Sequence, residues 1–173
     1  DPALAALDTS AYSDGVKFLL HSRTLACMNS TDWPADITFK TTPDAEDARL
    51  LALLPTWGAE HPGQTRLERE LMNAAAAIAH TVKDEAAFDQ LTSALESAAR
   101  GSAADGAIAA AYEVSAWNAR GGGAGDSVSD TAFKLFNERL SKGRDAAEAA
   151  WREDPLDSDC CDIMIQICRD LEL

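Results

Sequence analysis

The sequence predicts an all-α fold made of antiparallel helical hairpins, arranged as a tetratricopeptide-like helical array of about six to seven helices. Three observations lead to this prediction. Apolar residues recur at intervals of three and four along most of the 173-residue chain. Alanine, a strong helix former, is abundant, and runs of β-branched residues are nearly absent. Short polar or glycine-rich connections separate the periodic segments, as in stacked helix pairs.

The chain is long enough to bury one substantial core, so residues 1–173 are expected to form a single helical domain. Residues 1–63 are expected to hold N-terminal helices and loops, and residues 64–173 the helical-hairpin array. The one alternating segment, residues 36–42, is short and lies between two prolines. It is expected to be an extended linker and not a paired strand.

The first helix is predicted to begin near Ser10 or Ser13. Its core-facing positions are expected to be Val16, Leu19 or Leu20, Arg23 or Thr24, and Cys27, which recur at helical spacing. A second helix is expected to begin after the cap residue Thr42, and Pro55 is expected to end or kink it. Residues 55–63 contain two prolines and two glycines and are expected to form a loop.

Residues 64–101 predict a hairpin of two long helices. The first helix begins near Gln64, and Asp84 is the expected N-cap of the second, which Gly101 ends. The apolar face of the first helix is Leu67, Leu71, Ala75, Ile78 and Val82, and that of the second is Phe88, Leu91, Leu95 and Ala98. Because the connection is short, the two helices should be antiparallel.

Three more helices are predicted over residues 104–173. The first covers residues 104–120 and ends at a run of glycines, the second covers residues 129–152, and Ser158 is the expected N-cap of the third. The expected core-facing residues are Ile108, Tyr112, Ser115, Ala116 and Ala119 on the first helix, Phe133, Phe136, Leu140, Ala147 and Trp151 on the second, and Ile163, Met164, Ile167, Cys168 and Leu171 on the third.

Residues 104–173 also carry a family likeness. The pattern consists of Tyr112, Ala116–Trp117, Ala119–Arg120–Gly121, Phe136, Arg139–Leu140, residues 146–150 and Asp154–Pro155. It resembles the bacterial domain of unknown function 4034, which looks tetratricopeptide-like at this end. The resemblance implies stacked helices, and it supplies no catalytic residue because that family has no established reaction.

The candidate family-motif residues are Trp117, Arg120, Gly121, Phe136, Arg139 and Pro155. We interpret them first as structural residues. Trp117 should be buried between its own helix and the helix that carries Phe133 and Phe136. Arg120 should donate hydrogen bonds to the last carbonyls of its helix, and Gly121 should provide a left-handed C-cap. The alternative is a recognition surface formed by the indole of Trp117 and the guanidinium of Arg120.

The charge of the chain restricts its partners. Its 29 acidic and 15 basic residues give a formal net charge of −14, which disfavours binding to nucleic acid or to an anionic membrane. It is compatible with a solvated surface or with a basic protein partner. No segment approaches the roughly 20 apolar residues of a membrane span, so no membrane insertion is expected. A cytoplasmic location is favoured, with a periplasmic or secreted one, after removal of a leader, as the alternative.

Motifs for catalysis or metal binding are lacking in the sequence. Cys160, Cys161 and Cys168 crowd one predicted helix and are interpreted as core thiols. The histidines are scattered without paired spacing, and the glycines after residue 120 lack the lysine of a phosphate-binding loop. We therefore predict no catalytic residue, no metal and no cofactor.

The function that these observations favour is a non-enzymatic protein–protein interaction module of the helical-repeat type. Its acidic face or a groove would bind a protein partner, preferably a basic one. Two alternatives stay open. One is a specific inhibitor or immunity protein that blocks a toxin or an enzyme, and the other is an enzyme whose catalytic residues form no linear motif.

Overall fold

The computed structural model of the chain describes residues 6–29, 45, 48–53, 65–82, 84–98 and 101–171, and every regular element within them is helical. The elements are α2 (Asp14–Asn29), α4 (Thr65–Thr81), α5 (Glu85–Ala98), α6 (Ser102–Arg120), the short 3-10 helix η1 (Gly125–Ser127), α7 (Asp130–Glu153) and α8 (Ser158–Asp170). Residues 6–8 and 48–53 are also helical. The prediction of an all-α helical array is confirmed.

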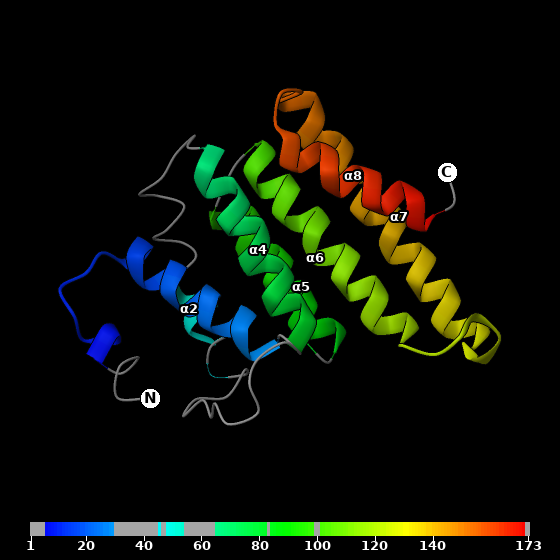
Figure 1. The fold of residues 1–173 in the computed structure, drawn as a ribbon, viewed down its shortest axis with the longest axis horizontal. Helices are drawn as coiled ribbons and strands as arrows, with labels where there is room; N and C mark the ends of the chain where they lie inside the picture. Colours follow the sequence, from blue (N-terminus) through cyan, green and yellow to red (C-terminus); the bar gives the residue numbers. More distant parts are fainter. Residues whose placement is uncertain are drawn as a thin grey trace.

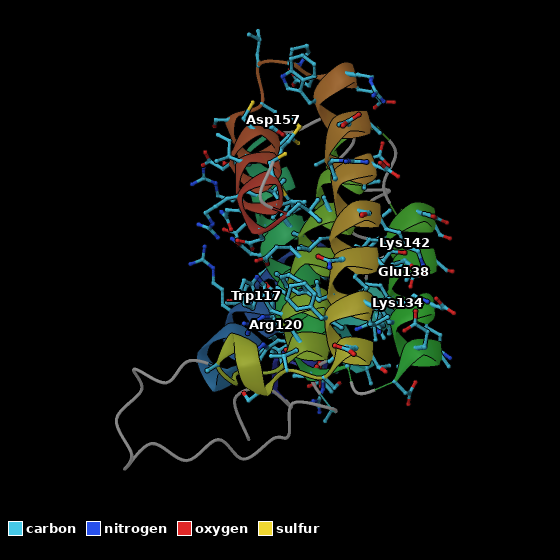
Figure 2. All side chains as sticks on the ribbon, turned by 90° about the vertical axis from the view of Figure 1, so that its right-hand side faces the viewer. Trp117, Arg120, Lys134, Glu138, Lys142 and Asp157 are labelled. Atoms are coloured by element: carbon cyan, nitrogen blue, oxygen red, sulfur yellow. The ribbon has the colours of Figure 1, made fainter. Side chains whose placement is uncertain are left out.

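The helices lie in two layers. Figure 1 shows α2, α4, α6 and α8 side by side in one layer, with α5 and α7 behind them, and the view in Figure 2 agrees. Followed along the chain, α5 returns antiparallel to α4, and α7 returns antiparallel to α6. Helix α6 is central, because it packs against α4, α5, α7 and α8.

Small side chains allow α6 to occupy this central place. Its buried residues include Ala107, Ala109, Ala110, Ala111 and Ala116, whose short side chains let neighbouring helices come close. At Gly106, an added Cβ would lie 3.2 Å from the Cys160 sulfur and 3.4 Å from the Met72 sulfur. Glycine at this position therefore lets α4 and α8 converge on α6.

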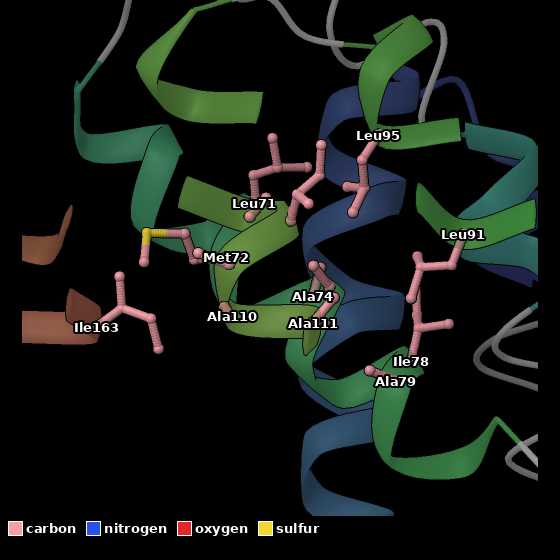
Figure 3. Close-up of a cluster of buried hydrophobic side chains, with 14 of the residues drawn as sticks. Leu71, Met72, Ala74, Ile78, Ala79, Leu91, Leu95, Ala110, Ala111 and Ile163 are labelled. Carbon is pink, nitrogen blue, oxygen red and sulfur yellow. The ribbon is translucent and has the colours of Figure 1, made fainter. Parts of the chain in front are cut away.

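The core of the α4–α5–α6 part follows the predicted periodicity. Leu71, Ala75 and Ile78 of α4 and Phe88, Leu91 and Leu95 of α5 are buried, and several of them meet α6 in Figure 3. The Asp84 carboxylate accepts a hydrogen bond from the Ala87 N–H at 2.8 Å, which confirms Asp84 as a cap. On α6, Ile108, Ser115 and Ala116 are buried as predicted, whereas Tyr112 and Ala119 are partly exposed.

Helix α7 begins as predicted, but its buried residues span a shorter part of the helix than predicted. Ser129 caps it by accepting from the Ala132 N–H, and its buried residues are Phe136, Leu140, Gly143, Ala147 and Ala150. The prediction that Phe133 and Trp151 face the core is wrong, because their exposed fractions are 47% and 43%. Both lie near the ends of a helix of 24 residues, which is longer than the neighbouring α6 (19 residues) and α8 (13 residues).

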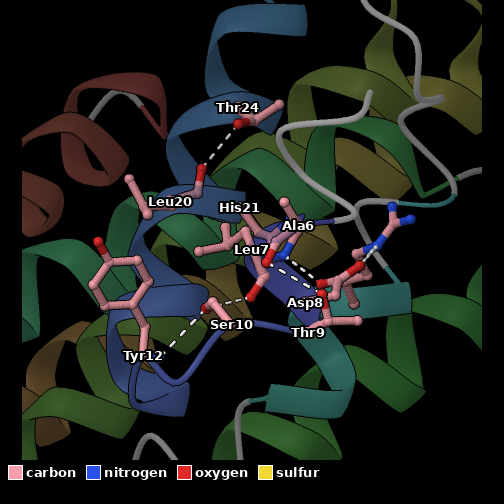
Figure 4. Close-up of polar contacts among 10 residues, drawn as sticks. Ala6, Leu7, Asp8, Thr9, Ser10, Tyr12, Leu20, His21 and Thr24 are labelled. Carbon is pink, nitrogen blue, oxygen red and sulfur yellow. Dashed lines mark hydrogen bonds and ion pairs between the residues drawn. The ribbon is translucent and has the colours of Figure 1, made fainter.

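The predicted face of α2 is also wrong. Val16 and Leu20 are exposed, and the buried residues are Phe18, His21, Ser22 and Leu25. Apolar residues occur around most of this helix, so spacing alone does not select one face. The polar His21 is buried because its Nε2 pairs with Asp8 Oδ1 at 2.9 Å, and Figure 4 shows this contact.

Several boundaries differ from the predictions or cannot be compared with them. Helix α6 begins at Ser102 and not at residue 104, with Gly101 as its N-cap at φ 78°. Asp157, and not Ser158, is the N-cap of α8, since its carboxylate accepts from the Asp159 N–H at 2.8 Å. The expectations for residues 36–42, Thr42, residues 55–63 and the side chains of Leu19, Cys27, Leu67 and Ala98 lie outside the described residues.

Candidate functional site

A groove runs between α4 and α8, with α6 as its floor. It contains two adjoining cavities of about 530 Å³ and about 420 Å³, which share Arg69 and Asp159 as lining residues. We call the first the junction pocket, because the segment between α7 and α8 lines it, and the second the floor pocket, because α6 lines it. Figure 3 shows Met72 of α4 and Ile163 of α8 approaching each other beside Ala110 of α6.

The linings of the two pockets differ. The junction pocket is lined by Arg69, Glu70, Asp154, Leu156, Asp157, Ser158 and Asp159. The floor pocket is lined by Arg69, Met72, Asn73, Ala76, Ala110, Glu113, Asp159, Asp162, Ile163 and Gln166. The floor pocket thus adds apolar side chains from all three helices to a set of carboxylates.

Negative charge dominates the groove. Its lining carries the carboxylates of Glu70, Glu113, Asp154, Asp157, Asp159 and Asp162 and the single cationic side chain of Arg69. Carboxylates gathered between low-dielectric walls strengthen the local field and attract cations. The site is therefore suited to a positively charged ligand.

Some of these carboxylates have structural partners. Arg69 donates from Nε to Asp159 Oδ2 at 2.8 Å and from Nη2 to Asp159 Oδ1, which connects α4 to α8. This hydrogen bonding and the charge of Asp159 raise the pKa of Arg69. Glu70 pairs with Arg23 of α2 at 2.8 Å, and Asp157 accepts from the Cys160 thiol at 3.0 Å. These contacts hold the walls of the groove in place.

Glu113 is the half-buried carboxylate on the groove floor. Burial and then the negative charge of Asp170 raise its pKa, and the charge of Arg169 and the nearby polar N–H of Trp117 oppose this. Asp170 itself is almost buried and accepts from the Trp117 Nε1–H at 2.9 Å. Trp117 thus links the floor of the groove to the end of α8.

The structure corrects the prediction for Trp117. Its ring packs edge-on against Phe136 with centroids 5.0 Å apart, as expected for a wedge between α6 and α7, yet the residue is 40% exposed. The prediction of substantial burial is therefore wrong, although Trp117 contacts both α7 and α8. The Arg120 guanidinium lies over this ring at 5.2 Å, and Figure 2 shows the two residues as neighbours.

Arg120 and Gly121 also differ from their expected roles. Arg120 donates to the carbonyls of Gly121 and Gly123, both at 3.2 Å, and not to the last carbonyls of its own helix. Gly121 has φ 76° and ψ 170°, so it has the expected positive φ but is not in the left-handed helical conformation. Only glycine adopts this region readily, and here it turns the chain sharply out of α6.

The remaining motif residues support the fold. Phe136 is buried, and Arg139 donates to the Ser115 carbonyl at 2.9 Å and to Glu85, which joins α7 to α6 and α5. Pro155 is exposed in the turn between α7 and α8. Trp117, Arg120 and Phe136 form one contacting group, but Arg139 and Pro155 belong to other parts of the structure.

Sequence reasoning missed Arg69, Glu113 and Asp162 as members of one site. The signal available was the density of acidic residues around the start of α8, at Asp157, Asp159 and Asp162. This signal could not reveal the groove, because the other wall of the groove comes from α4 and its floor comes from α6. Cys160 is buried, as expected for a core thiol, and Cys161 and Cys168 are partly buried.

In the part of the chain that the structure describes, no group of three or more histidine, cysteine, aspartate or glutamate side chains is arranged to hold a metal ion. No described helix combines the length and apolar character needed to cross a lipid bilayer.

Comparison with known proteins provides no further assignment. The chain matches no protein-family model, no curated protein and no solved structure. The resemblance to the bacterial domain of unknown function 4034 and the tetratricopeptide-like character of the array therefore stay predictions.

Proposed function

We propose that this chain is a protein-binding module whose groove between α4 and α8 accepts a basic segment of a partner protein. The observation that carries the proposal is the lining of the groove, which contains six carboxylates and one arginine. The formal charge of −14 for the whole chain supports it, because the surrounding field adds to the local one.

The groove can contribute to the affinity of the complex as well as to its rate of association. Exposed carboxylates such as Asp162 would increase the association rate of a cationic segment and make it sensitive to salt. Met72, Ala76 and Ile163 supply apolar surface that such a segment can cover. Recognition would thus combine charge attraction with apolar contact.

A labelled peptide of alternating arginine and leucine is a suitable probe, with an alternating glutamate–leucine peptide for comparison. Fluorescence anisotropy should show binding of the basic peptide that weakens as salt increases, and no binding of the acidic one. Duplex DNA and anionic vesicles should not bind at neutral pH.

The location of binding is tested by a pair of double variants with equal charge change. Glu70→Gln with Asp162→Asn removes two charges from the groove, and Asp89→Asn with Glu138→Gln removes two from α5 and α7. The groove variant should weaken binding of the basic peptide about fivefold and the control less than about twofold. Equal effects of the two variants would show that overall charge, and not the groove, binds the peptide.

A further inference from the structure

The floor pocket differs from the rest of the groove because it combines apolar walls with a carboxylate at depth. Met72 and Ala76 of α4 stand on one side and Ile163 of α8 on the other. Ala110 and Glu113 are three residues apart on α6 and share one face of the helix. The short side chain of Ala110 leaves space beside the Glu113 carboxylate.

Among the described residues, no lysine, arginine or histidine forms an ion pair with Glu113, and the guanidinium of Arg69 is bound to Asp159. The Asp170 carboxylate repels Glu113 and the charge of Arg169 attracts it, while the Trp117 indole N–H is donated to Asp170. A partly buried carboxylate in such surroundings gains free energy when a cation arrives.

We propose that the floor pocket binds the side chain of one arginine or lysine of the partner, with its charged end at Glu113 and its methylene groups against Met72, Ala76 and Ile163. This inference rests on the proposed function and names the residue type that the groove recognises. Long cationic side chains suit such a pocket, because their stems are apolar and their ends are charged. The opposite wall adds a second carboxylate, that of Asp162.

The pocket should also link binding to protonation. Burial and Asp170 raise the pKa of Glu113 in the free protein, and a bound cation would lower it again. The other charged groups around it are Arg69 of α4 and Asp159, Asp162, Arg169 and Asp170 of α8. Binding should therefore strengthen as pH rises through the raised pKa of Glu113.

The test measures the affinity of the arginine–leucine peptide for the wild type and for Glu113→Gln, Glu113→Asp and the control Glu138→Gln. Glu113→Gln should weaken binding about tenfold, Glu113→Asp should recover part of this loss, and Glu138→Gln should change it less than about twofold. The increase in affinity with pH should be smaller in Glu113→Gln than in Glu138→Gln.

Replacing each arginine of the peptide in turn by the neutral isostere citrulline identifies the anchored residue. One position should dominate in the wild type and lose its effect in Glu113→Gln, as a double-mutant cycle requires for a direct contact. Ala76→Leu, which fills the pocket without changing charge, should weaken binding severalfold.

The outcomes separate the two proposals. If the peptide binds and the Glu70 and Asp162 double variant weakens it, but Glu113→Gln behaves like Glu138→Gln, the groove is the binding site and the anchor is wrong. If no single citrulline position couples to Glu113, the anchor is equally wrong. If the wild type does not bind the basic peptide, the proposed function itself is wrong.

Discussion

Helix α6 presents two flanks that differ in how they are covered. Toward α7 the contact is tight, because an added Cβ at Gly143 of α7 would lie 3.1 Å from Tyr112 Cβ and 3.5 Å from the Ala109 carbonyl oxygen, both on α6. Toward α4 and α8, by contrast, Ala110 and Glu113 line an open, acidic pocket. Close packing on one flank fixes α6 in place. It thereby helps to fix the position of Glu113 on the other flank, where the side chain is only half-buried.

Truncating a side chain on the packed flank should have the largest effect on stability. Leu140→Ala removes a fully buried side chain of α7 and should lower the free energy of unfolding by about 3 kcal/mol, since it leaves a cavity. Chemical denaturation measures the loss. Ile165→Ala is the control, because Ile165 is 65% exposed on α8 and its loss should cost less than about 0.5 kcal/mol. Similar losses for both variants would contradict the assignment of Leu140 to the core.

Trp117 contacts helices on both flanks of α6, through Phe136 of α7 and Asp170 of α8. Trp117→Ala should lower the free energy of unfolding by about 2 kcal/mol, because it removes the edge contact with Phe136 and the hydrogen bond to Asp170. Trp151 is a matched control, since it is exposed to a similar degree and has no ring contact or hydrogen bond among the described residues. If Trp151→Ala costs as much by thermal denaturation, the contacts of Trp117 are not the cause.

Arg69 separates the two pockets of the groove and offsets part of their charge. Arg69→Ala should strengthen binding of the arginine–leucine peptide roughly threefold, because it frees Asp159 and removes a repelling cation. Arg152→Ala makes the same charge change on α7, where Arg152 pairs with Glu148 of its own helix, and should have less effect. An equal gain for both variants would mean that only net charge matters.

The smallest effect expected is that of Glu113→Gln on the stability of the free protein. A carboxyl group whose pKa is raised by folding favours the folded state while it is protonated. That contribution is complete below its ordinary pKa and is lost as pH rises through the raised one. Charged Glu113 therefore opposes folding at about pH 7, so the variant should melt at a higher temperature there and lose this advantage near about pH 4. A lower melting temperature at neutral pH would show that charged Glu113 stabilises the fold.

The helices from α4 to α8 could be predicted from sequence because each has apolar residues at helical spacing, and α5 and α7 also have recognisable caps, Asp84 and Ser129. The buried face of α2 could not, because apolar residues occur around most of this helix and the buried His21 pairs with Asp8, which lies outside it. The exposure of Trp117 depends on how the neighbouring helices surround it, and the groove depends on Arg69, Glu113 and Asp162 coming together from three helices. Such contacts are set by packing and not by local spacing.

Because the two flanks of α6 have different roles, they should differ in how readily they tolerate amino-acid substitutions. Exposed residues that line the floor pocket, such as Asn73 and Gln166, are separate from Gly143 and Leu140, which hold α6 against α7. Substitutions that change which side chain the pocket accepts can therefore arise one at a time, with most of the folding free energy left intact. The same fold can therefore acquire specificity for new ligands.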